Sequence, residues 1–132
     1  MRKQSWAEDL ATYIKESSTK EFQWGVHDCA SFAAGAVIAV TGRFIDVKDF
    51  ADAHTVREVV ELLATKSLKD RVTEILGKTI DLKMATRGDI VLLTDLGREC
   101  LGVCFGEVSF FLTAKGLQPI KTLTCDCAWR IE

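Results

Sequence analysis

The sequence predicts an α+β domain in which N-terminal helices pack on a small antiparallel β-sheet. Before Gly77, apolar residues recur at three- and four-residue spacing, which is typical of helices. After Gly77, short apolar runs alternate with glycines and charged residues, which is typical of an antiparallel meander. A chain of 132 residues with 48% hydrophobic residues is long enough to bury one core, so we expect a single domain over residues 1–132.

Two helices are predicted in the first third of the chain. Residues 5–17 carry an amphipathic pattern, with Ser5 as the N-cap and Glu8 as its capping-box partner. After a loop, residues 28–40 are apolar on every side and end at Gly42. A helix of this kind lies inside a core rather than on a surface.

The remaining elements are shorter. We predict a short helix at 48–53, a helix that begins after Thr55, and a helix over 67–76 that ends at Gly77. Arg87-Gly88-Asp89 is a turn signal, and the apolar run that follows it is typical of a buried strand. The predicted strands cover 90–93, 100–105, 108–113, 117–123 and 125–131.

Composition excludes several classes of function. A net charge of -2 argues against nucleic acid as a partner, because phosphate binding requires a basic face. The longest apolar run, over 33–40, is too short to cross a bilayer, so no membrane insertion is expected. No pattern indicates a cofactor. The five cysteines are an odd number, which favours reduced thiols over a disulfide framework.

Cys29 is the candidate nucleophile of this chain. It follows Asp28 at the predicted start of the buried helix, where free N–H groups and the helix dipole favour a thiolate. We therefore expect a lowered pKa for this thiol. Trp24 and Phe22 either shape a cleft beside Cys29 or anchor the loop as core aromatics, and Asp28 either contributes to that cleft or caps the helix. We take Trp24 and Asp28 as candidate substrate-binding residues.

Three segments together resemble a known family: Trp24-Gly25-x-x-Asp28-Cys29, Arg87-Gly88-Asp89-Ile90-Val91-Leu92-Leu93 and Leu101-Gly102-Val103. This order is similar to the NlpC/P60 branch of papain-like cysteine peptidases, especially short proteins of bacteriophage and prophage tail modules. The resemblance implies a nucleophilic cysteine packed against an antiparallel sheet. It also implies a histidine base at the start of the second strand and a polar residue on the next strand. The substrates of the family are the stem peptides of bacterial cell wall.

The sequence departs from this family at the expected base. Cys100 occupies the position of the histidine, and the third position falls in the stretch 112–114, which reads Leu-Thr-Ala. A thiol cannot replace imidazole as a general base near neutral pH. His27, two residues before Cys29, is the candidate substitute base, and His54 is a weaker one.

The resulting expectation is a tail component that keeps a peptidase fold without a full catalytic set. Its partners are then other tail proteins at the tip or hub, and its location is the virion tail after synthesis in the host bacterial cytoplasm. The alternative is an active cysteine peptidase or amidase that cleaves peptidoglycan stem peptides during infection, with Cys29 as nucleophile. A third possibility is a non-catalytic module that binds a cell-wall peptide.

Four further cysteines leave alternatives open. Apolar core filling is favoured for them, because they lack the Cys-x-x-Cys spacing of common zinc sites. A zinc site built from all four, or a disulfide between Cys29 and Cys100, remains an alternative. The four residues are Cys100, Cys104, Cys125 and Cys127.

Overall fold

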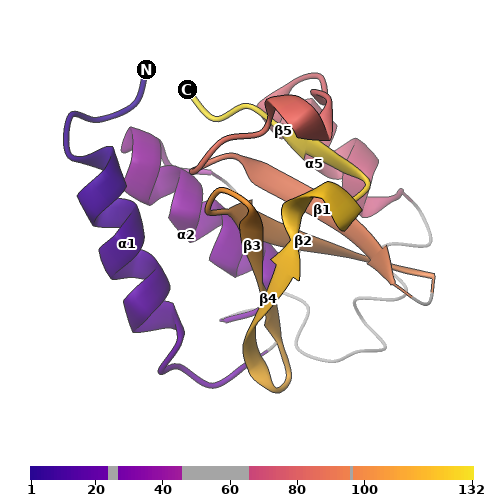
Figure 1. Cartoon of the computed structure of the whole chain (residues 1–132), viewed down its shortest axis with the longest axis horizontal. Coiled ribbons are helices and arrows are strands. Elements are labelled where there is room, and N and C mark those ends of the chain that lie inside the picture. Colours follow the sequence, from indigo (N-terminus) through magenta and orange to yellow (C-terminus); the bar gives the residue numbers. More distant parts are fainter. Residues whose placement is uncertain (24–26, 46–65, 96) are drawn as a thin grey trace.

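Two N-terminal helices lie on one face of an antiparallel sheet (Figure 1). The computed structural model describes residues 1–23, 27–45, 66–95 and 97–132. The two helices are α1 (Trp6–Ser17) and α2 (Cys29–Thr41). The strands are β1 (Ile90–Asp95), β2 (Arg98–Cys104), β3 (Val108–Thr113), β4 (Gly116–Lys121) and β5 (Cys127–Trp129). In the described residues they form one sheet in the order β4-β3-β2-β1-β5, which confirms the predicted α+β class.

Helix α1 begins where the sequence predicts, but not through the predicted capping box. Ser5 occupies the N-cap position, yet its side chain makes no capping hydrogen bond. Its hydroxyl instead donates to the carboxylate of Asp9 at 2.7 Å. The pairing of Ser5 with Glu8 is therefore wrong. Burial of Leu10 and Ile14 against the core holds the helix in place.

Helix α2 is buried along most of its length, as its apolar sequence predicts. It ends at Gly42, whose φ of 76° is a left-handed conformation that glycine adopts without strain. Tyr13 of α1 stacks on Phe32 of α2 with ring centroids 5.7 Å apart, and its hydroxyl donates to the Phe32 carbonyl at 2.8 Å. Gly35 makes this approach possible, because a Cβ there would lie 2.1 Å from the Tyr13 oxygen.

A third helix, α5 (Leu68–Leu76), confirms the prediction for 67–76. The carboxylate of Glu99 on β2 accepts hydrogen bonds from the N–H groups of Leu68 and Lys69, at 2.9 and 3.3 Å. The indole of Trp129 on β5 donates to the Thr73 hydroxyl at 3.2 Å. The sheet thus fixes both the start and the middle of α5. The helices predicted at 48–53 and after Thr55 lie outside the described residues.

Two short 3-10 turns were not predicted. They are η1 (Leu82–Met84) and η2 (Thr122–Thr124), and η2 ends the predicted strand 117–123 two residues early. The Thr122 hydroxyl donates to the carbonyl of Gly106 at 2.7 Å and bonds to the Ser109 hydroxyl at 2.8 Å. These side-chain bonds hold the chain in a turn. The last strand covers only three residues instead of the predicted 125–131.

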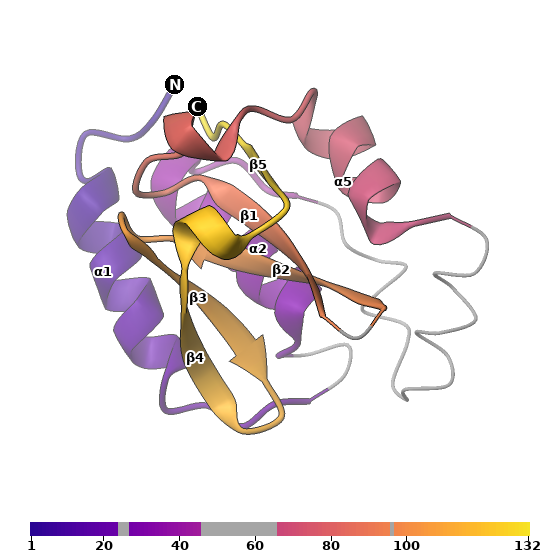
Figure 2. The ribbon, with the colours of Figure 1, turned by 45° about the vertical axis from the view of Figure 1, so that its right-hand side comes forward.

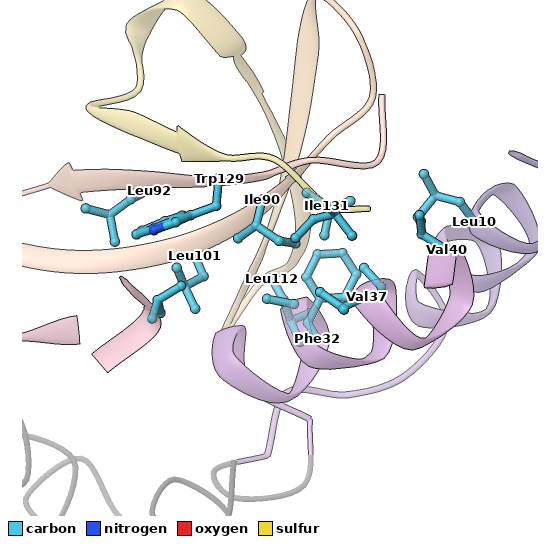
Figure 3. Close-up of a cluster of buried hydrophobic side chains, with 14 of the residues drawn as sticks. Leu10, Phe32, Val37, Val40, Ile90, Leu92, Leu101, Leu112, Trp129 and Ile131 are labelled. Carbon is cyan, nitrogen blue, oxygen red and sulfur yellow. The ribbon is translucent and has the colours of Figure 1, made fainter. Parts of the chain in front are cut away.

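The sheet separates two apolar clusters. The larger lies between the sheet and the helices (Figure 3). The smaller lies on the opposite face, where residues near η1 cover it. Alternation along β1 explains the division, because Ile90 and Leu92 belong to the first cluster and Val91 to the second. The labelled members of the larger cluster are Leu10, Phe32, Val37, Val40, Ile90, Leu92, Leu101, Leu112, Trp129 and Ile131.

Asp89 is a fully buried carboxylate that joins both ends of the chain to the sheet. Its Oδ1 accepts from the Arg2 guanidinium and from the Ile131 N–H, each at 3.0 Å. Its Oδ2 accepts from the Thr86 N–H at 2.9 Å and lies 3.4 Å from Nε of Arg130. N- and C-termini accordingly lie close together in both views (Figures 1 and 2). The Arg87-Gly88-Asp89 signal therefore marks a structural anchor.

Replacing Asp89 with asparagine is expected to lower the free energy of unfolding by about 3 kcal/mol. The amide N–H₂ group of the new side chain cannot accept a hydrogen bond, so it would face a donor, the Arg2 guanidinium or the Thr86 N–H, that the carboxylate now satisfies. Urea denaturation followed by circular dichroism measures the loss. Glu107→Gln, at an exposed position, is the matched control and should change stability by less than about 0.5 kcal/mol. Equal stability of the two variants would contradict the anchoring role.

Candidate functional site

Cys29 lies where two β-hairpins diverge. Strand β2 pairs with β1 from Arg98 to Val103, but with β3 only from Gly102 to Cys104. Figures 1 and 2 show the β1–β2 and β3–β4 hairpins spreading apart, with the N-terminal end of α2 beside the point of divergence. Cys29 is the first residue of α2, and the backbone of Leu101 on β2 acts to lower the pKa of its thiol. Leu101 belongs to the part of β2 that has no register partner on β3.

The environment of Cys29 disfavours the thiolate. Burial raises the pKa of the Cys29 thiol to about 12. The hydrogen bonds from the N–H groups of Leu101 and Ala30 lower this pKa, but they do not offset burial, and the nearby Cys100 and Asp28 raise it further. The expectation of a lowered pKa is therefore wrong, because desolvation outweighs the start of the helix.

Asp28 is the N-cap of α2. Its carboxylate accepts a hydrogen bond from the Ser31 N–H at 2.9 Å, and the residue is 2% exposed. This confirms the predicted cap and explains why the helix begins at Cys29. A role for Asp28 in substrate binding stays a prediction. Trp24, the other candidate substrate-binding residue, lies outside the described residues.

His27, the candidate substitute base, is engaged with α1. The residue is buried, and its Nε2 lies 3.3 Å from the carbonyl oxygen of Ser17, the last residue of α1. Its backbone exchanges two hydrogen bonds with Gln23, at 2.9 and 2.7 Å. The His27 ring therefore contacts the end of α1. His54 lies outside the described residues.

Cys100 stands on β2 opposite Leu93 of β1, one residue before the Leu101 amide that contacts Cys29. It is half-buried, and burial raises the pKa of its thiol, with Asp95 acting in the same direction and Arg98 against it. Leu112, in the stretch expected to supply the third catalytic residue, is a buried core residue. The Cys100 side chain packs against the smaller apolar cluster, on the face of the sheet opposite the one that α2 covers.

The other three cysteines do not form a metal site. Cys104 and Cys125 belong to the smaller cluster, whereas Cys127 belongs to the larger cluster on the opposite face of the sheet. Within the described ranges, no three side chains of the His, Cys, Asp or Glu type gather as metal ligands. The alternative of a four-cysteine zinc site is therefore wrong. All five cysteines are free thiols.

No sequence pattern marks the Leu101 amide, because every residue except proline carries a backbone N–H. Only the register of β2 shows which amide reaches the thiol. The pattern Leu101-Gly102-Val103 nevertheless marks this part of the strand. A Cβ at Gly102 would lie 2.6 Å from the ring of Phe111, its cross-strand partner, so glycine is required there for the ring to cover β2.

One protein-family model matches residues 1–131, and its description is "Domain of unknown function (DUF6950)". No curated protein and no solved structure matches the chain. None of the helices in the described ranges has the length and apolar character needed to cross a membrane.

Removing the Asp28 cap is expected to destabilise the site. Asp28→Ala should lower the free energy of unfolding by about 1 kcal/mol, because the Ser31 N–H loses its acceptor, whereas Asp28→Asn should stay close to the wild type. Thermal and urea unfolding of the three proteins measure the difference. An equal loss in both variants would show that charge, rather than capping, is the contribution of Asp28.

The raised thiol pKa predicts how Cys29 reacts. Between about pH 7 and pH 10, the rate of Cys29 alkylation by iodoacetamide should rise about tenfold per pH unit without a plateau, because the thiolate fraction keeps growing below a pKa of about 12. Peptide mapping by mass spectrometry follows this residue alone. The urea-unfolded chain is the control, and its rate should level off above about pH 8.5. A plateau below about pH 8 in the folded protein would contradict the raised pKa.

Proposed function

The chain belongs to the family described as "Domain of unknown function (DUF6950)", and we propose that it is a structural component of a phage or prophage tail. In this proposal it keeps a papain-like, NlpC/P60-type fold but has lost the catalytic set. Its partners are other tail proteins at the tip or hub, and it is made in the host bacterial cytoplasm before it enters the virion.

The observation that supports the loss of catalysis is the environment of the Cys29 thiol. A cysteine peptidase needs a thiolate and an acid that protonates the leaving amine. Burial holds the Cys29 thiol protonated, with a pKa of about 12. Cys100 stands where the family places the base, and its thiol is also held protonated by a raised pKa. Neither residue supplies the proton transfers that amide hydrolysis requires.

The fold supports the resemblance without deciding it. A cysteine at the start of a buried helix packs against the second strand of an antiparallel sheet, and a Gly-Asp pair precedes the first strand. Both features match what the NlpC/P60 resemblance implies. The tail assignment rests on the resemblance alone, since fold by itself does not determine function.

An active peptidoglycan peptidase or amidase is the second candidate. One observation favours it: Cys29 is only half-buried and stands in the first turn of a capped helix, where the backbone of Leu101 and Ala30 acts to lower the pKa of the thiol. This candidate requires a base from another source, such as a rearranged His27. The same experiment separates the two candidates.

The purified protein is expected to release no product from muropeptides or intact peptidoglycan, because Cys29 has no base and stays protonated. Chromatography of the digest with mass detection measures turnover, and a known cell-wall peptidase is the positive control. Turnover that disappears in Cys29→Ala would overturn the structural proposal. Binding of muropeptides without turnover would instead favour a binding module.

The second arm tests the tail assignment in the virus itself. Particles produced with Cys29→Ala should assemble normally and contain the protein in their tails, as judged by electron microscopy and immunodetection. The destabilised Asp89→Asn protein is the matched control, and it should lower the yield of intact tails. Absence of the wild-type protein from purified particles would contradict the assignment.

A further inference from the structure

We propose that the surface formed by η1, η2 and the turn between β2 and β3 is the interface of a weak homodimer, in which two copies of the chain meet around a two-fold axis. We call this surface the turn face. Its members are Met84, Arg87, Phe105, Glu107 and Leu123. The partner is a second copy of the chain, and the proposal does not depend on the assignment to a tail.

The turn face covers the side of the sheet that carries no helix. Helices α1 and α2 lie on one face of the sheet, and Figure 2 shows η2 in front of the sheet with α2 behind it. In the residues that the structure describes, two three-residue turns that pack against each other lie over the smaller cluster. A sheet usually buries each apolar face under a full layer of structure. A second copy of the chain would supply the missing layer.

The centre of the turn face is apolar. Met84, at the end of η1, is 61% exposed, and Leu123, in η2, is 70% exposed. Because η1 packs against η2, both side chains belong to one surface. The half-buried Phe105 borders them, since the next turn residue but one, Glu107, accepts a hydrogen bond at its carbonyl from the Thr122 N–H of η2, at 2.9 Å. Exposed apolar side chains that gather in one place are typical of protein–protein contacts.

Two charges of opposite sign flank this apolar centre. The exposed Arg87 stacks its guanidinium on the Phe105 ring, 4.5 Å from the ring centroid. Glu107 is exposed in the turn between β2 and β3. Within the described ranges, neither side chain forms an ion pair. Arg87 follows Met84 by three residues, whereas Glu107 bonds to η2, so the cation lies on the η1 side and the anion on the η2 side.

A surface with this arrangement of charge is complementary to itself. After a two-fold rotation, Arg87 of one copy faces Glu107 of the other, and the reverse pair forms at the same time. The Phe105 ring orients the guanidinium in advance, which reduces the entropy lost on pairing. A partner of one charge sign would instead require a face of the opposite sign. The other charged residues beside the two turns are two of each sign: Asp81, Lys83, Lys121 and Asp126.

Concentration is the first variable of the test, because a small interface gives weak association. Stable interfaces use about 20–30 residues on each side, which is more than the turn face offers. Sedimentation equilibrium of the whole purified chain should give the mass of one chain at about 1 µM and approach the mass of two chains at about 500 µM. Unfolding measurements at about 1 µM therefore report on the monomer.

An apolar substitution tests the centre of the interface. Leu123→Ser should weaken dimerisation at least about tenfold, because the serine side chain cannot replace the apolar surface that leucine buries. Phe44→Ser is the matched control. Phe44 is 79% exposed but follows the end of α2, outside the turn face, so its loss should leave the dimerisation constant unchanged.

Charge reversal tests the predicted pairing. Arg87→Glu and Glu107→Arg should each stay monomeric at about 500 µM, because like charges would then meet twice across the two-fold axis. An equal mixture of these two variants should dimerise again, since each variant supplies the charge that the other has lost. Circular dichroism of both variants verifies that the fold is kept.

Three results would overturn the proposal. They are the mass of one chain for the wild type at every concentration, a dimer that survives both charge reversals, and a mixture that associates no more than its components. Peptidoglycan turnover and incorporation into tails do not enter these measurements, so failure of the dimer and failure of the proposed function are separate outcomes.

Discussion

The buried carboxylate of Asp89 is the interaction on which the rest of the structure depends. A buried charge is tolerated only when donors surround it, and the donors here come from the N-terminus, the C-terminus and the turn before β1. The Asp89 carbonyl also accepts from the Cys104 N–H at 2.8 Å, so the same residue sets the register of β2 on β1. Because β1 lies between β2 and β5, the position of its first residue determines where both neighbouring strands pair with it.

The geometry around Cys29 follows from this register. Once Cys104 is placed opposite Asp89, Leu101 stands opposite Leu92 and its side chain joins the larger cluster. The backbone N–H of Leu101 lies beyond the residues of β2 that pair with β3, and it acts to lower the pKa of the Cys29 thiol at the start of α2. The Asp28 cap sets the first residue of α2, so the cap and the anchor together determine which thiol meets which amide.

Local sequence patterns predicted most of the helices and strands, because helix periodicity and capping depend on residues that are close together in the sequence. The spacing of apolar residues located α1, α2 and α5, and the cap at Asp28 follows from its own side chain and the next turn. Long-range contacts were missed. The turn η2 exists because the Thr122 hydroxyl bonds to the carbonyl of Gly106, 16 residues earlier. Glu99 caps a helix 31 residues before it in the chain, a pairing that no sequence window contains.

The pKa of Cys29 was the most consequential wrong expectation, and magnitudes explain it. A helix N-terminus stabilises a negative charge by about 0.3–1 kcal/mol, which is less than one pKa unit. Burial raises the pKa of the Cys29 thiol to about 12, against about 8.5 for an exposed cysteine. A peptidase overcomes such desolvation with an imidazolium beside the sulfur, whose full charge acts at short range. Cys100 brings no charge of that sign, so the helix alone cannot make Cys29 a nucleophile.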